Sequence, residues 1–159
     1  MVVNDFDGDG NLDVLINGND YSTEVSTGRY DAFNGLLLKG DGKGGFTPLT
    51  ILQRGIYIVG DGKGLVKLLS ASGDYLIAAS QHKDVLKLFK LKKKTKTVKV
   101  SPDDVSAILK FKNGSIQKEE FYYGNSFLSQ SGRFLTINEN VSEVQIKNSK
   151  GNNRRISFN

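Results

Sequence analysis

Residues 4–17 read "NDFDGDGNLDVLIN" and place four aspartates, Asp5, Asp7, Asp9 and Asp13, within nine residues. An aliphatic run of the kind that forms a buried strand follows at once. Two unit charges about 4 Å apart repel by about 1 kcal/mol in water and about 4 kcal/mol near a protein surface. We therefore expect a folded loop of this composition to hold a positive charge.

The spacing of these acidic residues suits a calcium ion. Calcium takes about six to eight oxygen ligands, and alternate residues of a tight loop can point carboxylates at one centre. The candidate ligands are the carboxylates of Asp5, Asp7, Asp9 and Asp13 and the backbone carbonyl of Asn11. An EF-hand is excluded, because its closing glutamate is replaced here by Ile16 and the residues that follow the loop favour a strand over a helix.

Short apolar or β-branched runs separated by glycine and aspartate turns recur along the chain, which predicts an all-β fold. The first four runs are "MVVN" (1–4), "LDVLING" (12–18), "GLLLKG" (35–40) and "FTPLTIL" (46–52). The next four are "GLVKLLSAS" (64–72), "DYLIAAS" (74–80), "DVLKLFKLK" (84–92) and "KTVKVS" (96–101). Four antiparallel strands in about 45 residues are typical of one β-propeller blade. The segment "GDGKG" occurs at 40–44 and 60–64, where we expect two tight turns.

Residues 4–18, "NDFDGDGNLDVLING", resemble the FG-GAP or VCBS repeat, the blade unit of integrin-α-like propellers. That repeat carries a D-x-D-x-D-G-x-x-D calcium loop between its first two strands, and all four acidic positions are filled here. The downstream "LLLKGDGKGGFT" (36–47) resembles the end of such a blade. The resemblance implies that calcium binds Asp5, Asp7, Asp9, Asn11 and Asp13. A solvated acidic turn without an ion is the alternative.

The second set of strands departs from this pattern. Where the acidic loop would lie it has "SASGDY" (70–75), which keeps only Asp74. We therefore expect one Ca²⁺ site, with a structural role, because an ion that cancels the repulsion orders the loop and ties two strands together.

A lysine- and threonine-rich stretch followed by Ser101-Pro102 indicates a boundary near residues 94–103. We expect two propeller-like blades in 1–95, the second degenerate, and a small β domain in 96–159. A hairpin turning on Asn113-Gly114, the favoured pair for a two-residue turn, would place Phe111 opposite Ile116.

Residues 113–131, "NGSIQKEEFYYGNSFLSQS", resemble the ASPIC/UnbV domain that follows VCBS repeats in bacterial surface proteins and in relatives of cartilage acidic protein. The residues that carry this resemblance are Gly124, Ser126, Leu128, Ser129 and Gln130. The family's F-G-L-G and W-P-S-G segments are absent. Their absence weakens the inference that this chain shares the family's function more than the inference that it shares the family's fold.

The segment "NDYSTEVSTGRYDAFNG" (19–35) is long for a loop between strands, and long ordered loops are often functional. It combines aromatic rings, a guanidinium and a carboxylate that suit a glycan or peptide ligand, namely Tyr21, Arg29, Tyr30 and Asp31. The alternative is a loop that packs on a neighbouring blade or on the C-terminal domain.

Residues 83–99 carry eight lysines, which would bind phosphates of a nucleic acid such as RNA. However, the interleaved apolar residues are those of a strand core, and only Phe89 offers a ring for base stacking. Since lysine also protects exposed edge strands from aggregation, we favour a solvated edge strand or linker.

An enzyme is disfavoured. The chain has no cysteine, a single histidine (His82) and no G-x-S-x-G elbow, so Ser126, Ser129 and Ser131 lack a base. Adjacent Glu119 and Glu120 would point to opposite faces of a strand and could not flank one bond. The first residues, "MVVNDFDG", lack the pattern of a signal peptide, so we expect none in this chain, and no apolar run approaches the ~20 residues of a membrane span.

We therefore expect a non-enzymatic, calcium-binding adhesion or scaffold module, with a nucleic-acid-binding protein as the alternative. The family resemblance implies an extracytoplasmic location: the cell surface, the periplasm or the secreted fraction. Two blades cannot close a propeller, which usually has about 4–8, so we expect a fragment of a longer protein or chains that pair through open strand edges. The sequence identifies no protein or glycan ligand.

Overall fold

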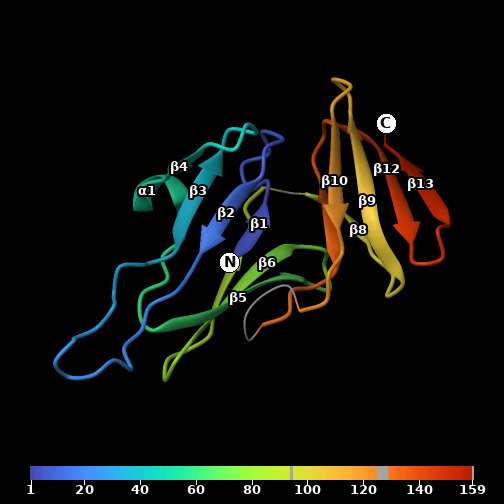
Figure 1. The fold of residues 1–159 in the computed structure, drawn as a ribbon. Coiled ribbons are helices and arrows are strands. Elements are labelled where there is room, and N and C mark those ends of the chain that lie inside the picture. The colour runs from blue at the N-terminus through green and yellow to red at the C-terminus, as the bar shows by residue number, and fades with distance from the viewer. Residues whose placement is uncertain (94, 125–128, 159) are drawn as a thin grey trace. The chain divides into compact units, whose positions relative to one another are not determined.

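The computed structural model describes residues 1–93, 95–124 and 129–158, and it confirms an all-β chain built from several antiparallel sheets (Figure 1). The chain divides into two compact units. Unit 1 comprises Met1–Lys94 and Gly124–Gly132, and unit 2 comprises Thr95–Tyr123 and Arg133–Asn159. Among the described residues no helix has the length and hydrophobicity needed to cross a bilayer.

The first sheet of unit 1 has the order β1-β2-β3-β4, with neighbouring strands antiparallel. Its strands are β1 (Val2–Asn4), β2 (Asp13–Ile16), β3 (Leu36–Gly40) and β4 (Phe46–Pro48). Val2 and Leu15 pair across β1 and β2, and both side chains are buried. The aspartate-rich segment is the loop between these two strands, so its position follows directly from the pairing.

The strand expected over residues 46–52 is too long, because it ends at Pro48 and is followed by the single helical turn α1 (Ile51–Arg54). Thr50 caps this turn. Its hydroxyl accepts a hydrogen bond from the Gln53 backbone, and the Gln53 side chain bonds back to the Thr50 backbone, which is a capping box. Gly55 then ends the turn in the left-handed conformation.

The second sheet of unit 1 has the order β5-β6-β7. Its strands are β5 (Gly62–Leu69), β6 (Tyr75–Gln81) and β7 (Lys87–Lys90). The expectation of four strands is wrong here, because residues 96–99 pair within unit 2 instead. Both sheets of unit 1 are open, and the described residues form no closed propeller.

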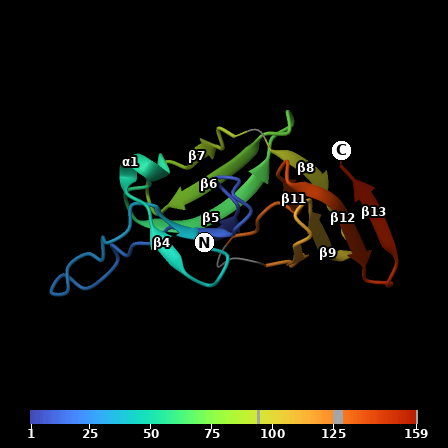
Figure 2. The same ribbon diagram turned by 90° about the horizontal axis from the view of Figure 1, so that it is seen from above.

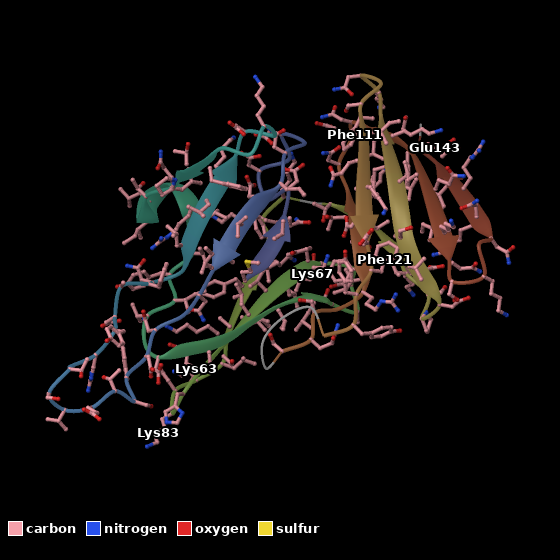
Figure 3. The ribbon with its side chains drawn as sticks, viewed as in Figure 1. Lys63, Lys67, Lys83, Phe111, Phe121 and Glu143 are labelled. Atoms are coloured by element: carbon pink, nitrogen blue, oxygen red, sulfur yellow. The ribbon has the colours of Figure 1, made fainter. Side chains whose placement is uncertain are left out.

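The two copies of "GDGKG" fold differently. The first is a tight turn, as expected, with Gly42 and Gly44 at positive φ. The second is not a turn throughout, because β5 begins at Gly62, beside Lys63 (Figure 3). A Cβ at Gly62 would collide with the side chain of Asn17, so a larger residue here would force that side chain to move.

The segment Gly124–Gly132 interrupts unit 2 in the sequence but belongs to unit 1. The backbone N–H of Gly132 donates to the carbonyl of Lys67 on β5 (2.7 Å), and the N–H of Lys67 donates to the buried hydroxyl of Ser131 (3.1 Å). Two of the residues in the ASPIC/UnbV resemblance, Ser126 and Leu128, lie outside the described residues.

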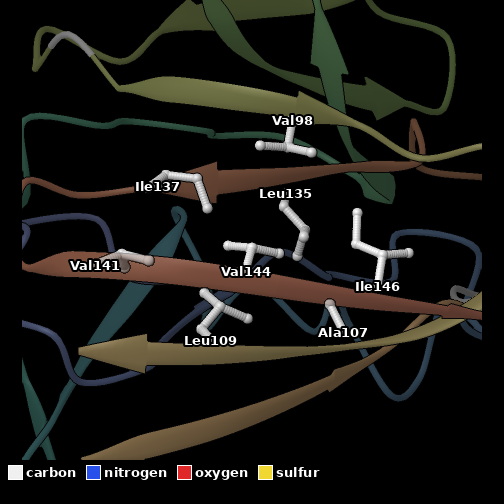
Figure 4. Close-up of a cluster of buried hydrophobic side chains, with 8 residues drawn as sticks. All are labelled: Val98, Ala107, Leu109, Leu135, Ile137, Val141, Val144 and Ile146. Atoms are coloured by element: carbon white, nitrogen blue, oxygen red, sulfur yellow. The ribbon is translucent and has the colours of Figure 1, made fainter. Parts of the chain in front are cut away.

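Unit 2 contains a four-stranded sheet, order β10-β9-β12-β13, and a two-stranded sheet, order β11-β8. The strands are β8 (Lys96–Lys99), β9 (Asp104–Phe111), β10 (Ile116–Glu120), β11 (Phe134–Ile137), β12 (Val141–Asn148) and β13 (Asn153–Ser157). Inward-facing aliphatic side chains from four of these strands form one buried cluster (Figure 4): Val98, Ala107, Leu109, Leu135, Ile137, Val141, Val144 and Ile146.

The hairpin of β9 and β10 turns at Asn113-Gly114, but the expected register is wrong by one residue. Ile116 pairs with Lys110 rather than Phe111, and the N–H of Phe111 donates to the carbonyl of Ser115 (3.0 Å). The loop therefore has three residues, with Gly114 at a φ of 84°, which is the common alternative to a two-residue turn.

Candidate metal site

The loop between β1 and β2 brings three carboxylates together. Asp5, Asp7 and Asp13 each offer one oxygen atom, and these oxygens lie within 4.8 Å of one another. Among the described residues this is the only group of three or more acidic or histidine side chains with such spacing. Hard, oxygen-only donors of this kind suit calcium or magnesium rather than softer metals.

Asp13 is held rigidly because it is almost fully buried, with 2% of its surface exposed. Its two carboxylate oxygens accept hydrogen bonds from the backbone N–H groups of Phe6 and Gly40, both at 3.0 Å. Burial raises the pKa of Asp13 against the opposing effect of these hydrogen bonds. A Cβ at Gly40 would collide with the carbonyl of Leu12, so only glycine allows β3 to approach the loop this closely.

Asp5 is positioned by the loop itself. Its carboxylate accepts hydrogen bonds from the N–H groups of Gly8 (2.5 Å) and Gly10 (3.0 Å). Both glycines have positive φ, at 78° and 94°, which turns their N–H groups inward at no steric cost. Two of the three convergent carboxylates are therefore oriented by backbone donors, as ligands of a metal usually are.

The carboxylate of Asp9 is not part of the group of three. Asp9 accepts a hydrogen bond from the N–H of Asn11 (2.8 Å). Burial would raise the pKa of Asp9, but the Asn11 hydrogen bond and Lys39 outweigh it and hold that pKa below its usual value. The side chain of Asn11 is directed at Gly42, where an added Cβ would collide with it, and the backbone carbonyl of Asn11 stays the predicted ligand atom.

Two lysines that sequence reasoning missed lie at the loop. Lys39 on β3 forms ion pairs with Asp7 and with Asp9, the latter at 3.0 Å. The ammonium of Lys93 donates to the backbone carbonyl of Asp7 (3.1 Å). The carboxylates raise the pKa of Lys39 further above its ordinary value, so it is charged at neutral pH. The position of Lys39 follows from strand pairing. Because Val14 on β2 pairs with Leu38 on β3, Lys39, the residue after Leu38, lies at the end of the loop.

The long loop of residues 19–35 gathers three of its four expected ligand-binding residues. The hydroxyl of Tyr21 donates to Asp31 (2.7 Å), and the guanidinium carbon of Arg29 lies 4.9 Å from the centre of the Tyr21 ring. The hydrogen bond to Asp31 raises the pKa of Tyr21. Tyr30 pairs through its backbone with Asp20, and its side chain is exposed.

Asn19 anchors the base of this loop, and sequence reasoning missed it. Its side-chain amide donates to the carbonyls of Phe33 (2.7 Å) and Gly60 (2.8 Å) and accepts from the N–H of Phe33 (2.9 Å). The loop is thus tied to the segment that leads into β5, while most of its remaining residues are exposed. The exposed part is the surface that could meet a ligand.

The lysine-rich stretch is divided between the two units and does not form one strand core. Lys87 and Lys90 lie on β7, an edge strand, whereas Lys96 and Lys99 lie on β8 of unit 2. Val85, Leu86 and Leu88, expected in a core, are exposed. Val85 and Leu86 precede β7, and Leu88 lies on it, at the edge of the sheet.

No family model, no curated protein and no solved structure matches this chain. Membership of the FG-GAP/VCBS and ASPIC/UnbV families therefore stays a prediction from the sequence.

Proposed function

We propose that unit 1 carries a calcium-binding loop of the FG-GAP/VCBS type. The observation that supports it best is the convergence of Asp5, Asp7 and Asp13, from a loop whose sequence fills all four acidic positions of that repeat. Three carboxylates together require a positive charge nearby, and a divalent ion supplies more of it than one lysine.

The residues present fit such an ion. Asp5, Asp7 and Asp13 would hold it through carboxylate oxygens and Asn11 through its carbonyl, and Asp9 would become available when Lys39 withdraws. The ion supplies charge neutralisation and cross-links the end of β1 to the start of β2. Its role is structural, because nothing else in the loop is a nucleophile or a general acid.

The proposed activity is that of a non-enzymatic binding or scaffold module with propeller-like blades, followed by an ASPIC/UnbV-like domain and located outside the cytoplasm. Extracellular calcium is abundant enough to fill weak sites, with Kd values of about 10⁻⁴–10⁻³ M. The exposed loop of residues 19–35 is the surface we assign to a protein or glycan ligand. The edge strands β4 and β7 are where a further blade or a second chain would pair.

A thermal melt of the whole chain, with calcium and then with excess chelator, tests the proposal. A ligand at about a hundredfold excess over its Kd stabilises the folded state by about 2.7 kcal/mol. For a unit of this size we expect a rise in Tm of roughly 10 °C. An equal Tm in calcium and in chelator would refute the calcium site.

A further inference from the structure

Unit 1 contains a cavity of about 520 Å³ that borders the calcium loop at Phe6, Asp7 and Asp13 and extends well beyond it. It is bounded by β2 and β3 of the first sheet, by α1, and by β6, β7 and the residues that follow β7. In Figure 2, α1 and β7 are seen at the same side of unit 1. A volume of this size is typical of sites for small molecules, which span about 300–1,000 Å³.

The floor of this cavity is apolar. Aliphatic and aromatic side chains from both sheets and from the segment around α1 line it: Leu15, Leu37, Leu49, Ile56, Ile77 and Phe89. Leu15, Ile56 and Ile77 are buried, so their positions are fixed by the packing of the unit. Such a surface has no hydrogen-bonding groups to offer and favours a ligand with a hydrocarbon part.

The polar part of the lining is predominantly basic. The cations are Lys39, Arg54, Lys90, Lys92 and Lys93, and the acids are Asp7 and Asp13, so the formal charge is five minus two, or +3. Three of the cations are already engaged: Lys39 with Asp7, Lys90 with Asp74 (2.8 Å), and Arg54 with the carbonyl of Ile56 (3.1 Å).

Lys92 and Lys93 differ from Lys39 and Lys90, whose ammonium groups are paired with carboxylates. Lys93 donates only to a neutral carbonyl, that of Asp7, and no carboxylate in the described residues forms an ion pair with either lysine. Both side chains are exposed and follow directly after β7, beside the apolar floor. Two ammonium groups without an ion pair, in a lining that carries an excess of positive charge, are complementary to a molecule with an anionic head and an apolar tail.

We infer that this cavity binds an aliphatic carboxylate, with the tail against the apolar floor and the carboxylate at Lys92 and Lys93. Each methylene removed from water strengthens binding by roughly fourfold, so affinity should rise with chain length until the cavity is filled and then level off. Asp7, Asp13 and Lys39 belong both to the proposed calcium site and to the lining of this cavity, so the binding test is made with calcium removed.

Isothermal titration of the whole chain with octanoate, decanoate and dodecanoate, each below its micelle concentration and with chelator present, tests the inference. We expect saturable binding that tightens about fourfold per methylene over part of the series. Decanol, which has the same tail and no charge, should bind at least about tenfold more weakly than decanoate.

The double variant Lys92→Ala, Lys93→Ala should weaken decanoate by at least about tenfold and remove the preference over decanol. Lys43→Ala is the matched control, since Lys43 is exposed in unit 1 and does not line the cavity. Leu52→Asn, at an exposed position on the cavity rim, should weaken all three acids with little effect on folding. Absence of saturable binding, independence from chain length, or equal affinity in the lysine double variant would each overturn the inference.

Discussion

The ammonium nitrogen of Lys39 lies 3.0 Å from Oδ2 of Asp9, and the same group is paired with Asp7. A cation on β3 is therefore seated against a loop that joins β1 to β2. The positive charge expected from the crowding of aspartates thus has one source within the chain. If a metal ion binds the same carboxylates, it competes with this lysine.

Replacing Lys39 by methionine should strengthen calcium binding, because the ion no longer has to displace an ammonium group from Asp7 and Asp9. We expect Kd to fall by roughly five- to tenfold, and we expect the protein in chelator to be less stable because its carboxylates lose a neutralising partner. Calorimetric titration with calcium measures the first effect and a thermal melt measures the second.

Lys43→Met is the control for this change, since Lys43 lies in the turn between β3 and β4 and its side chain forms no ion pair with the carboxylates of the described residues. Equal Kd values for Lys39→Met and the wild type would show that the lysine and the ion do not compete. Failure of both proteins to bind calcium would instead refute the proposed site itself.

Asp7→Asn should weaken calcium binding by at least about tenfold, because it removes one of three convergent carboxylates from an ion that binds through charge. Asp7 is exposed, so the fold should tolerate the change. Asp41→Asn is a matched control. Asp41 also lies in a glycine-rich turn and accepts hydrogen bonds from the N–H groups of Lys43 (2.7 Å) and Gly45 (2.9 Å), but it is outside the cluster. An equal loss of calcium affinity in both variants would mean that the ion responds to the net charge of the protein and not to coordination by Asp7.

The strands of this chain could be predicted from the sequence because alternation of apolar and polar residues is a local signal. The partner of each strand could not. The segment 96–101 has the same pattern whether it completes a sheet of unit 1 or, as observed for residues 96–99, pairs with Phe134–Ile137. Which partner a strand pairs with depends on contacts between residues far apart in the sequence. The alternation of apolar and polar residues along one strand does not encode those contacts.

Local signals were also available for features that the sequence reasoning missed. Thr50 and Gln53 have the spacing of a capping box, which indicates the helical turn that replaces the end of a strand. The aspartates of the candidate site could be predicted from their spacing in the sequence, whereas the contact made by Lys93 could not. It reaches Asp7 from 86 residues away, and only the packing of the two sheets brings it there.

Asn19→Ala should loosen the loop of residues 19–35. The change removes hydrogen bonds to Phe33 and Gly60 from a nearly buried side chain, at a cost of about 1–3 kcal/mol. Local opening then exposes the bond after Arg29 more often. We expect trypsin to cleave this bond faster in Asn19→Ala than in the control Ser26→Ala, which changes an exposed position of the same loop. Mass spectrometry measures the rate of cleavage. Equal rates in the two variants would show that Asn19 does not hold the loop.

Leu135→Ala tests whether the buried cluster of unit 2 provides the stability of that unit. The side chain of Leu135 is 0% exposed and packs among aliphatic residues of β8, β9 and β12. Removing it should lower the free energy of unfolding by about 2–5 kcal/mol, through lost burial and the cavity left behind. The control Ile116→Ala deletes a side chain of similar size at a position on β10 that is 66% exposed, and it should cost well under about 1 kcal/mol. Urea denaturation measures both, and similar losses in the two variants would contradict the packing described here.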